Sequence, residues 1–257
     1  MWELKNYKKE IIKKIEEYFS SKQTFTRKEL FDFLELNFYP NLKETTFRWR
    51  IYELRKTNII VSVTRGVFKL SENKELFVPN ISKQLSKIGN LIKKNYNSVF
   101  NCVWSSNWLN EFSRHQATKE IVIVEVEKEL VNSVFNLLID NNYKNVYIEP
   151  DKFVTETYIS ENQTSIIVKS LITKSPIQFV ANVAVPKLEK ILVDLFSDNK
   201  YLIAYKGYEQ KIIFENAFDK YQLNLSSLIN YSRRRKKNKL ITEFLITKIN
   251  IDEELLK

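Results

Sequence analysis

The sequence is poor in the residues that build several common kinds of functional site. It has one cysteine, Cys102, one histidine, His115, and three glycines, Gly66, Gly89 and Gly207. A single cysteine excludes an internal disulfide, and the lack of a cysteine and histidine cluster leaves a zinc site without ligands. A phosphate-cradling loop needs several glycines close together, which excludes a P-loop and a dinucleotide-binding fingerprint. We therefore expect no cofactor and no metal.

Long apolar runs are also missing. Stretches such as Ile121 to Val124 are far too short to span a bilayer, and the first residues carry charges every few positions instead of the apolar core of a signal peptide. Hydrophobic residues still make up 44% of the chain, which is a globular rather than a disordered composition. We expect a cytoplasmic protein with no membrane partner.

The excess of positive charge is confined to two short segments. The formal net charge is +10. Residues 43–69 carry seven Lys and Arg against two Glu, a net of +5, and residues 233–239 carry six Lys and Arg with no acid, a net of +6. The rest of the chain therefore sums to −1. Charge gathered in this way favours nucleic-acid binding more than an evenly spread excess does.

The first seventy residues predict three helices followed by a hairpin. Apolar residues at three- and four-residue spacing predict a first helix up to Phe19, and Thr26 with Glu29 forms a capping box that opens a second helix ending near Asn37. A third helix is expected over 44–57. Strands at 59–63 and 67–70 then form a hairpin whose tip includes Gly66, which can supply the positive φ that such a tip needs. This is the order of a winged helix-turn-helix.

The third helix has a basic and aromatic face opposite its apolar stripe, which runs from Phe47 to Leu54. In helix-turn-helix proteins the later helix enters the major groove of DNA. Arg50 lies nearer the stripe, and we expect it to pair internally with Glu53 or Glu29. The predicted base or sugar contacts are Thr45, Arg48, Trp49 and Tyr52, and the predicted phosphate contacts are Lys43, Arg55, Lys56, Arg65 and Lys69. A winged helix used only as a protein-binding adaptor remains an alternative.

The residues after Pro79 predict a mixed α/β domain with a helical C-terminal end, joined by a linker near 72–80. Strands are expected at 100–104, 120–126, 146–149 and 165–172, and helices at 81–97, 107–112, 129–140, 185–196, 209–221, 224–235 and 238–248. Pro186 is expected in the first turn of its helix, and Asp194 on the exposed side or as a cap. The predicted domains are 1–78, the DNA-binding domain, and 79–257; the fold class is α+β or α/β.

This second domain offers little catalytic chemistry. His115 is expected to be a surface or capping histidine. Glu125 and Glu127 lie two apart on a strand, so their carboxylates point the same way and could share a divalent ion. The Ser105-Ser106 pair precedes them at about the distance of a nucleotidyltransferase Gly-Ser signature, but the glycine is missing. We therefore predict no catalytic residues, with a divergent nucleotidyltransferase as the alternative.

A run of five basic residues lies near the end of the chain. Cations favour the C-terminal end of a helix, but five in a row exceed what that role requires. We predict that the run contacts phosphate or an acidic partner surface through Arg233, Arg234, Arg235, Lys236 and Lys237.

Four segments carry a resemblance to a known family. They are Thr26 to Leu70, Val103 to Ser106 before a short helix, Val185 to Leu195, and the late helical stretch Leu225 to Leu245. Together they resemble the AbiEi-type antitoxins of bacterial abortive-infection, or type IV toxin–antitoxin, systems. The resemblance implies an autorepressor that binds inverted repeats of double-stranded DNA upstream of its own operon. It also implies that the protein opposes a co-encoded nucleotidyltransferase-like toxin in phage defence, without requiring a stable complex.

Overall fold

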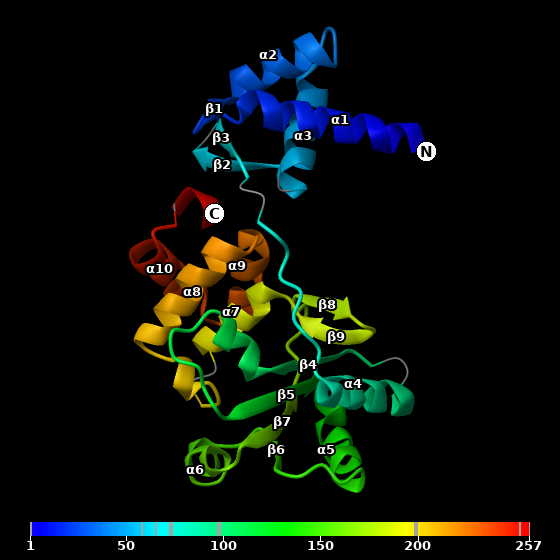
Figure 1. Ribbon diagram of the computed structural model, residues 1–257, viewed down its shortest axis with the longest axis vertical. Helices are drawn as coiled ribbons and strands as arrows, with labels where there is room; N and C mark the ends of the chain where they lie inside the picture. Colours follow the sequence, from blue (N-terminus) through cyan, green and yellow to red (C-terminus); the bar gives the residue numbers. More distant parts are fainter. Residues whose placement is uncertain are drawn as a thin grey trace. The chain divides into compact units, whose positions relative to one another are not determined.

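The computed structural model describes residues 2–57, 59–64, 66–71, 74–96, 99–197, 200–251 and 253–256, and it is a mixed α+β structure (Figure 1). Its chain forms two compact units, unit 1 with Met1–Lys74 and Asp252–Lys257, and unit 2 with Glu75–Ile251. The sequence places the division after residue 78 and assigns the last residues to the second domain. The contacts instead group η5 (Glu253–Leu256) with unit 1, because this turn packs against a strand of that unit.

The described part of unit 1 holds helices and a small antiparallel sheet. Its elements are α1 (Trp2–Phe19), β1 (Phe25–Thr26), α2 (Arg27–Asn37), α3 (Glu44–Lys56), β2 (Ile60–Thr64) and β3 (Val67–Leu70). The sheet order is β1-β3-β2. The predicted capping box is confirmed, since Thr26 Oγ1 accepts from the Glu29 amide at 3.2 Å and Glu29 Oε2 accepts from the Thr26 amide at 2.7 Å. Gly66 has a φ of 79°, as the hairpin tip requires.

Unit 2 is built around a mixed sheet whose order, within the described residues, is β4-β5-β7-β6. β5, β7 and β6 are parallel, and β4 is antiparallel to β5. The strands are β4 (Asn101–Ser105), β5 (Glu120–Val126), β6 (Val146–Ile148) and β7 (Thr164–Ser170), and a separate hairpin joins β8 (Ile177–Val180) to β9 (Val183–Pro186). The α-helices are α4 (Lys83–Asn95), α5 (Val131–Asp140), α6 (Lys152–Thr157), α7 (Leu188–Ser197), α8 (Tyr208–Lys220), α9 (Leu225–Arg234) and α10 (Asn238–Ile249). Short 3-10 turns are η1 (Ser106–Glu111), η2 (Lys128–Leu130), η3 (Ile159–Glu161) and η4 (Ile203–Tyr205).

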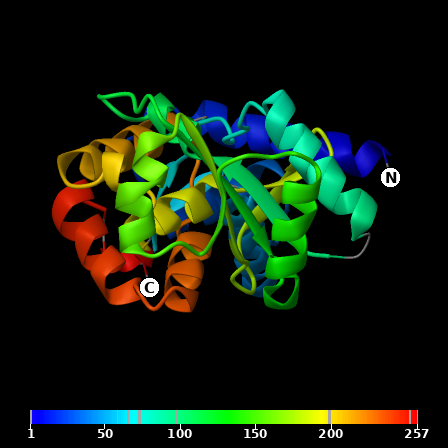
Figure 2. The same ribbon diagram turned by 90° about the horizontal axis from the view of Figure 1, so that it is seen from below.

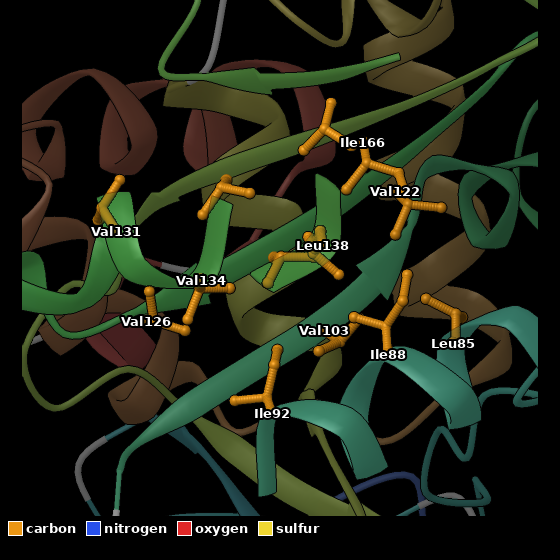
Figure 3. Packing of buried hydrophobic residues seen from close by; sticks show 13 residues of the cluster. Leu85, Ile88, Ile92, Val103, Val122, Val126, Val131, Val134, Leu138 and Ile166 are labelled. Atoms are coloured by element: carbon orange, nitrogen blue, oxygen red, sulfur yellow. The ribbon is translucent and has the colours of Figure 1, made fainter. Parts of the chain in front are cut away.

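The two faces of this sheet have different partners. On one face, alternate strand residues such as Val103, Val122 and Ile166 pack against α4 and α5 in an apolar cluster (Figure 3). The intervening residues point to the other face because side chains alternate along a strand. Figures 1 and 2 show α4 and α5 on one side of the sheet and α7 to α10 on the other. The second face therefore lies under helices from the C-terminal part of the unit.

The β8–β9 hairpin corrects the prediction for Pro186. The sequence assigns this proline to the first turn of a helix, but it is the last residue of β9, opposite Ile177, and α7 begins at Leu188. Proline has no N–H for the ladder, so the end of a strand suits it as well as the start of a helix does.

Within the described residues no helix combines the length and the apolar character needed to cross a bilayer.

Candidate nucleic-acid interface and a buried charge network

Most of the side chains predicted to contact DNA are exposed, and most of these lie on or beside α3. Phe47 and Leu54 on the opposite side of the helix are buried in the core of unit 1. Two aromatic rings are unusually accessible, with Trp49 50% and Tyr52 58% exposed. The exposed predicted residues are Lys43, Thr45, Arg48, Trp49, Tyr52 and Arg55 around α3, and Lys69 on β3. Arg65 and the side chain of Lys56 lie outside the described residues.

Glu44 is the acidic residue on this face of α3. Its carboxylate accepts a hydrogen bond from Arg27 and one from Arg48 Nε at 3.2 Å. The hydrogen bond from Arg27, followed by that from Arg48, lowers the pKa of Glu44. Arg27 also covers the ring of Phe47, with its guanidinium carbon 4.7 Å from the ring centre. Because the Glu44–Arg48 ion pair is exposed to water, separating Arg48 from Glu44 costs little free energy.

Arg50 pairs with Glu53 on its own helix, as the sequence predicts. Its Nη1 donates to Glu53 at 2.9 Å, and its guanidinium lies 4.8 Å from the ring centre of Tyr39. Glu29, the other predicted partner, instead accepts from Lys22 Nζ at 2.5 Å. That bond, with the Thr26 amide and hydroxyl, lowers the pKa of Glu29 to about 2. Arg50 is therefore partly buried in unit 1, and its guanidinium also lies 5.0 Å from the ring centre of Trp49, at the edge of the exposed face.

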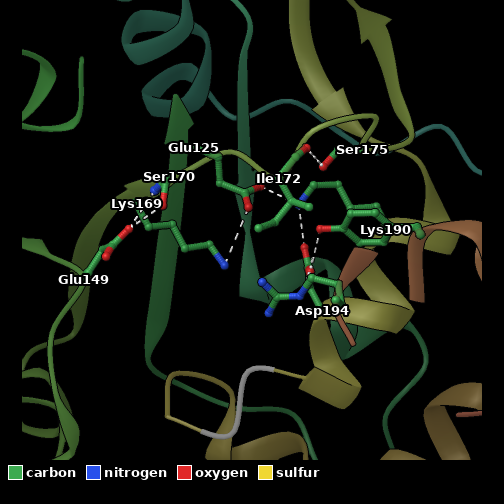
Figure 4. A network of polar contacts seen from close by, with 10 residues as sticks. Glu125, Glu149, Lys169, Ser170, Ile172, Ser175, Lys190 and Asp194 are labelled. Carbon is green, nitrogen blue, oxygen red and sulfur yellow. Dashed lines mark hydrogen bonds and ion pairs between the residues drawn. The ribbon is translucent and has the colours of Figure 1, made fainter. Parts of the chain in front are cut away.

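Unit 2 contains a network of buried charges on the second face of its sheet (Figure 4). Lys190 on α7 is completely buried. Its Nζ lies 2.5 Å from a carboxylate oxygen of Glu125 on β5. It also lies 2.5 Å from a carboxylate oxygen of Asp194, which is one turn further along the same helix. Lys169 on β7 pairs directly with Glu125 in the parallel register, with its Nζ 3.6 Å from the Glu125 Oε1. Charges taken out of water need such partners.

Helix α9 and the residue that follows it complete the network. The Tyr231 hydroxyl donates to Asp194 at 2.9 Å, and the Arg235 Nε lies 3.4 Å from the same carboxylate oxygen. Burial by itself would lower the pKa of Lys190, but the carboxylates of Asp194 and Glu125 outweigh burial and raise this pKa well above its usual value. Burial, with the charge of Asp194, raises the pKa of Tyr231. Lys190 is therefore held as a cation and Tyr231 as a neutral donor.

Two sequence interpretations are corrected by this network. Asp194 is buried, not on the exposed side of its helix. Glu125 is also buried and faces Lys190, whereas Glu127 lies beyond the end of β5 and its Oε1 accepts from the Phe100 amide at 3.4 Å. Among the described residues, no three His, Cys, Asp or Glu side chains are placed to hold a metal ion. The sequence did contain a signal, because charged residues interrupt both apolar strands and the apolar helix α7.

The basic run near the end of the chain does not form one surface. Arg235 points inward to Asp194, and its side chain is only 15% exposed. Arg233, which donates to Asn230 Oδ1 at 2.9 Å, is exposed, as are Arg234 and Lys236. Lys237 is partly buried at the start of α10. The predicted phosphate or partner contact is therefore open to Arg233, Arg234 and Lys236 more than to the others.

The single histidine lies at the surface, as predicted. The side chain of His115 is 80% exposed, and its Nδ1 is 2.6 Å from Glu209 Oε1. The hydrogen bond with His115 lowers the pKa of Glu209. This pair ties the segment after η1 to the first turn of α8.

The comparisons with known proteins identify a family whose function is unknown. A model described as a family of unknown function, DUF6577, matches residues 46–251. The match begins inside α3 and covers the whole of unit 2. A comparison with curated proteins gives no match.

Proposed function

The chain belongs to DUF6577, a family of unknown function, and we propose that it binds double-stranded DNA through unit 1. The observation that carries the proposal is the exposed face of α3, where Arg48, Trp49 and Tyr52 are accessible beside Lys43 and Arg55. Large aromatic rings and cations together on an outward helix face suit stacking on sugars and hydrogen bonding to phosphates and bases. A helix that was merely solvated would not need them.

The order of elements supports a winged helix-turn-helix. α2 and α3 are separated by a turn in which Asn41 has a φ of 62°, and α3 is followed by the β2–β3 hairpin. In this class of fold the later helix lies in the major groove. α3 is accordingly the recognition helix of the proposal, and the hairpin is the wing.

The contacts divide into two kinds. Thr45, Arg48, Trp49 and Tyr52 are assigned to bases and sugars, because the early residues of a recognition helix reach the groove floor. Lys43, Arg55, Lys56, Arg65 and Lys69 are assigned to phosphates, which fix the register without reading the sequence. Because each neutralised phosphate releases counterions, the affinity should fall steeply with salt.

The biological role follows from the resemblance to AbiEi-type antitoxins. In this proposal the protein represses its own operon at inverted repeats and opposes a nucleotidyltransferase-like toxin. The alternative enzyme reading receives no support from Glu125, whose carboxylate is neutralised by Lys190 and lies buried. The adaptor alternative predicts no DNA affinity above the non-specific level.

The first experiment is a gel-shift and footprint of the full chain on the DNA upstream of its own gene, at two salt concentrations. The test variant is Arg48→Ala with Lys69→Ala. Its matched control is Lys13→Ala with Lys14→Ala, which removes the same charge from exposed positions of α1. We expect a discrete protected site that the test variant loses and the control keeps. Equal binding of operator and random DNA, or equal loss in both variants, would reject the proposal.

A further inference from the structure

A large cavity lies in unit 2 beside the ends of its central strands. Its volume is about 920 Å³, within the range of small-molecule sites. Its lining comes from the end of α4, the start of β4, the residues after β5 and β7, and the β8–β9 hairpin. These segments all belong to unit 2. The cavity is thus separate from the proposed DNA-binding face on α3.

The topology of the sheet explains why a cavity forms here. Glu127 and Leu171, which both line it, directly follow the carboxyl ends of the neighbouring parallel strands β5 and β7. From β5 the chain continues to α5 on one face of the sheet, and from β7 it continues through the hairpin to α7 on the other. Connections that leave neighbouring strands toward opposite faces open a crevice at their carboxyl ends, where α/β proteins bind ligands.

The helix α4 closes one wall by approaching the hairpin closely. A Cβ at Gly89 would lie 2.8 Å from Val183 Cγ1, so glycine is required for this approach. Val183 is buried and lines the cavity with its neighbour Ala184. The contact sets this wall without a large side chain, which leaves the space in front of it open.

The chemistry of the lining is apolar with a positive edge. Phe100 and Phe179 line the cavity, yet they are 74% and 77% exposed, which is unusual for large apolar side chains. Lys93 and Lys174 also line it and are exposed, whereas Glu127, the carboxylate among the described lining residues, is engaged with the Phe100 amide. The cationic groups therefore have the greater share of the charge that faces a ligand.

We propose that this cavity binds a small amphipathic molecule whose apolar body lies between the hairpin and α4 and whose anionic head group lies at Lys93 and Lys174. Both parts of this ligand follow from the lining, since apolar walls favour a hydrocarbon or aromatic body. The positive edge selects an anion over a cation by charge complementarity.

The test is a calorimetric titration of the full chain with three probes of the same chain length: decanoate, decanol and decyltrimethylammonium. The two ions are used below their micelle concentrations and decanol below its solubility limit. We expect decanoate to bind on the order of 10-fold more tightly than decanol, and the cation to bind most weakly. In the variant Lys93→Gln with Lys174→Gln, the affinity for decanoate should fall to about the affinity for decanol. Equal affinities of the three probes for the native chain would overturn the proposal.

Matched controls separate the cavity from general surface binding. Lys94→Gln with Lys187→Gln removes two exposed charges outside the cavity and should leave decanoate binding unchanged. Thr173→Trp, at an exposed lining position, should abolish binding, whereas Asn90→Trp on the exposed side of α4 should not. Loss in both tryptophan variants would overturn the proposal. So would a dimer of the native chain that Phe179→Ser dissociates, because the cavity would then be a contact between two copies.

Discussion

Two helices of this protein carry an ion pair with the same spacing and the opposite environment. On α3 Glu44 pairs with Arg48, and on α7 Lys190 pairs with Asp194, each one turn apart. The side chain of Arg48 is 75% exposed, whereas Lys190 and Asp194 are completely buried. The order on α3, with the acid nearer the N-terminus, is the better one for an isolated helix. Local sequence therefore favours the exposed pair, although the buried pair has more partners.

The difference shows what solvent does to the same chemistry. An exposed pair is worth about 0–1 kcal/mol, so Arg48 can leave Glu44 for another anion at little cost. A buried pair cannot lose one member without leaving an unpaired charge in an apolar interior, which costs about 3–5 kcal/mol. Arg48 on α3 is thus available for binding, and the cations around α7 are committed to the fold of unit 2.

The largest expected effect comes from breaking the buried pair. Lys190→Met removes the cation between Glu125 and Asp194, and we expect unit 2 to lose about 3–5 kcal/mol of unfolding free energy. Urea unfolding followed by circular dichroism measures this loss. Tyr231→Phe, which removes one hydrogen bond to Asp194, should cost less, about 1.5–3 kcal/mol. A loss below 1 kcal/mol in Lys190→Met would show that the network does not hold the fold.

Substitution of Arg48, in the exposed pair, should affect DNA binding and not stability. We expect Arg48→Ala to reduce discrimination at one base pair of the operator by about 1–3 kcal/mol. Its unfolding free energy should stay within about 0.5 kcal/mol of the native value, as for other surface substitutions. Lys69→Ala should weaken operator and random DNA alike. Competition titrations against single-base variants of the operator separate the two effects, and identical profiles for both variants would contradict the assignment.

The capping box adds a third case to the comparison of exposed and buried pairs. It is exposed, and yet its hydrogen bonds are made to backbone amides. Thr26→Ala removes the acceptor for the Glu29 amide at the start of α2, and we expect a loss of about 1 kcal/mol. Thr24→Ala, at an exposed position outside this box, serves as the control and should change little. Thermal unfolding of both variants measures the difference. Equal midpoints would mean that α2 does not depend on its cap.

The smallest effect concerns the pH dependence of Glu29. Its pKa is lowered to about 2 from an ordinary value of 4.5, because the carboxylate accepts from Lys22 and Thr26. The stabilisation is therefore fully present above pH 4.5 and is lost as the pH falls toward 2. Glu29→Gln should remove this part of the acid destabilisation. Above pH 5 the stability of the variant should depend on pH in the same way as that of the native chain. Unfolding measured from pH 2 to 7 tests it, and an unaltered acid limb in the variant would contradict the assignment.

Local patterns predicted most of the elements. The spacing of apolar residues placed α1, α2 and α3, and the Thr26–Glu29 box located the start of α2. The alternation of apolar residues also placed β4, β5, β6 and β7. These features depend on neighbours within a few residues, so a single sequence carries them. The β8–β9 hairpin was missed because Val183 to Pro186 are buried throughout, and a short apolar run fits a helix and a strand equally well.

The sequence by itself determined where charge and apolar residues lie along the chain, and with them most of the helices and strands and the basic face of α3. The tertiary structure alone decided that the charges around Lys190 are kept away from water. Glu125, Lys169, Lys190 and Asp194 come from three elements far apart in sequence, and only the packing of α7 on the sheet brings them together in the interior. The cavity beyond β5 and β7 likewise exists only once the strands are ordered. Burial depends on long-range packing, which no local pattern records.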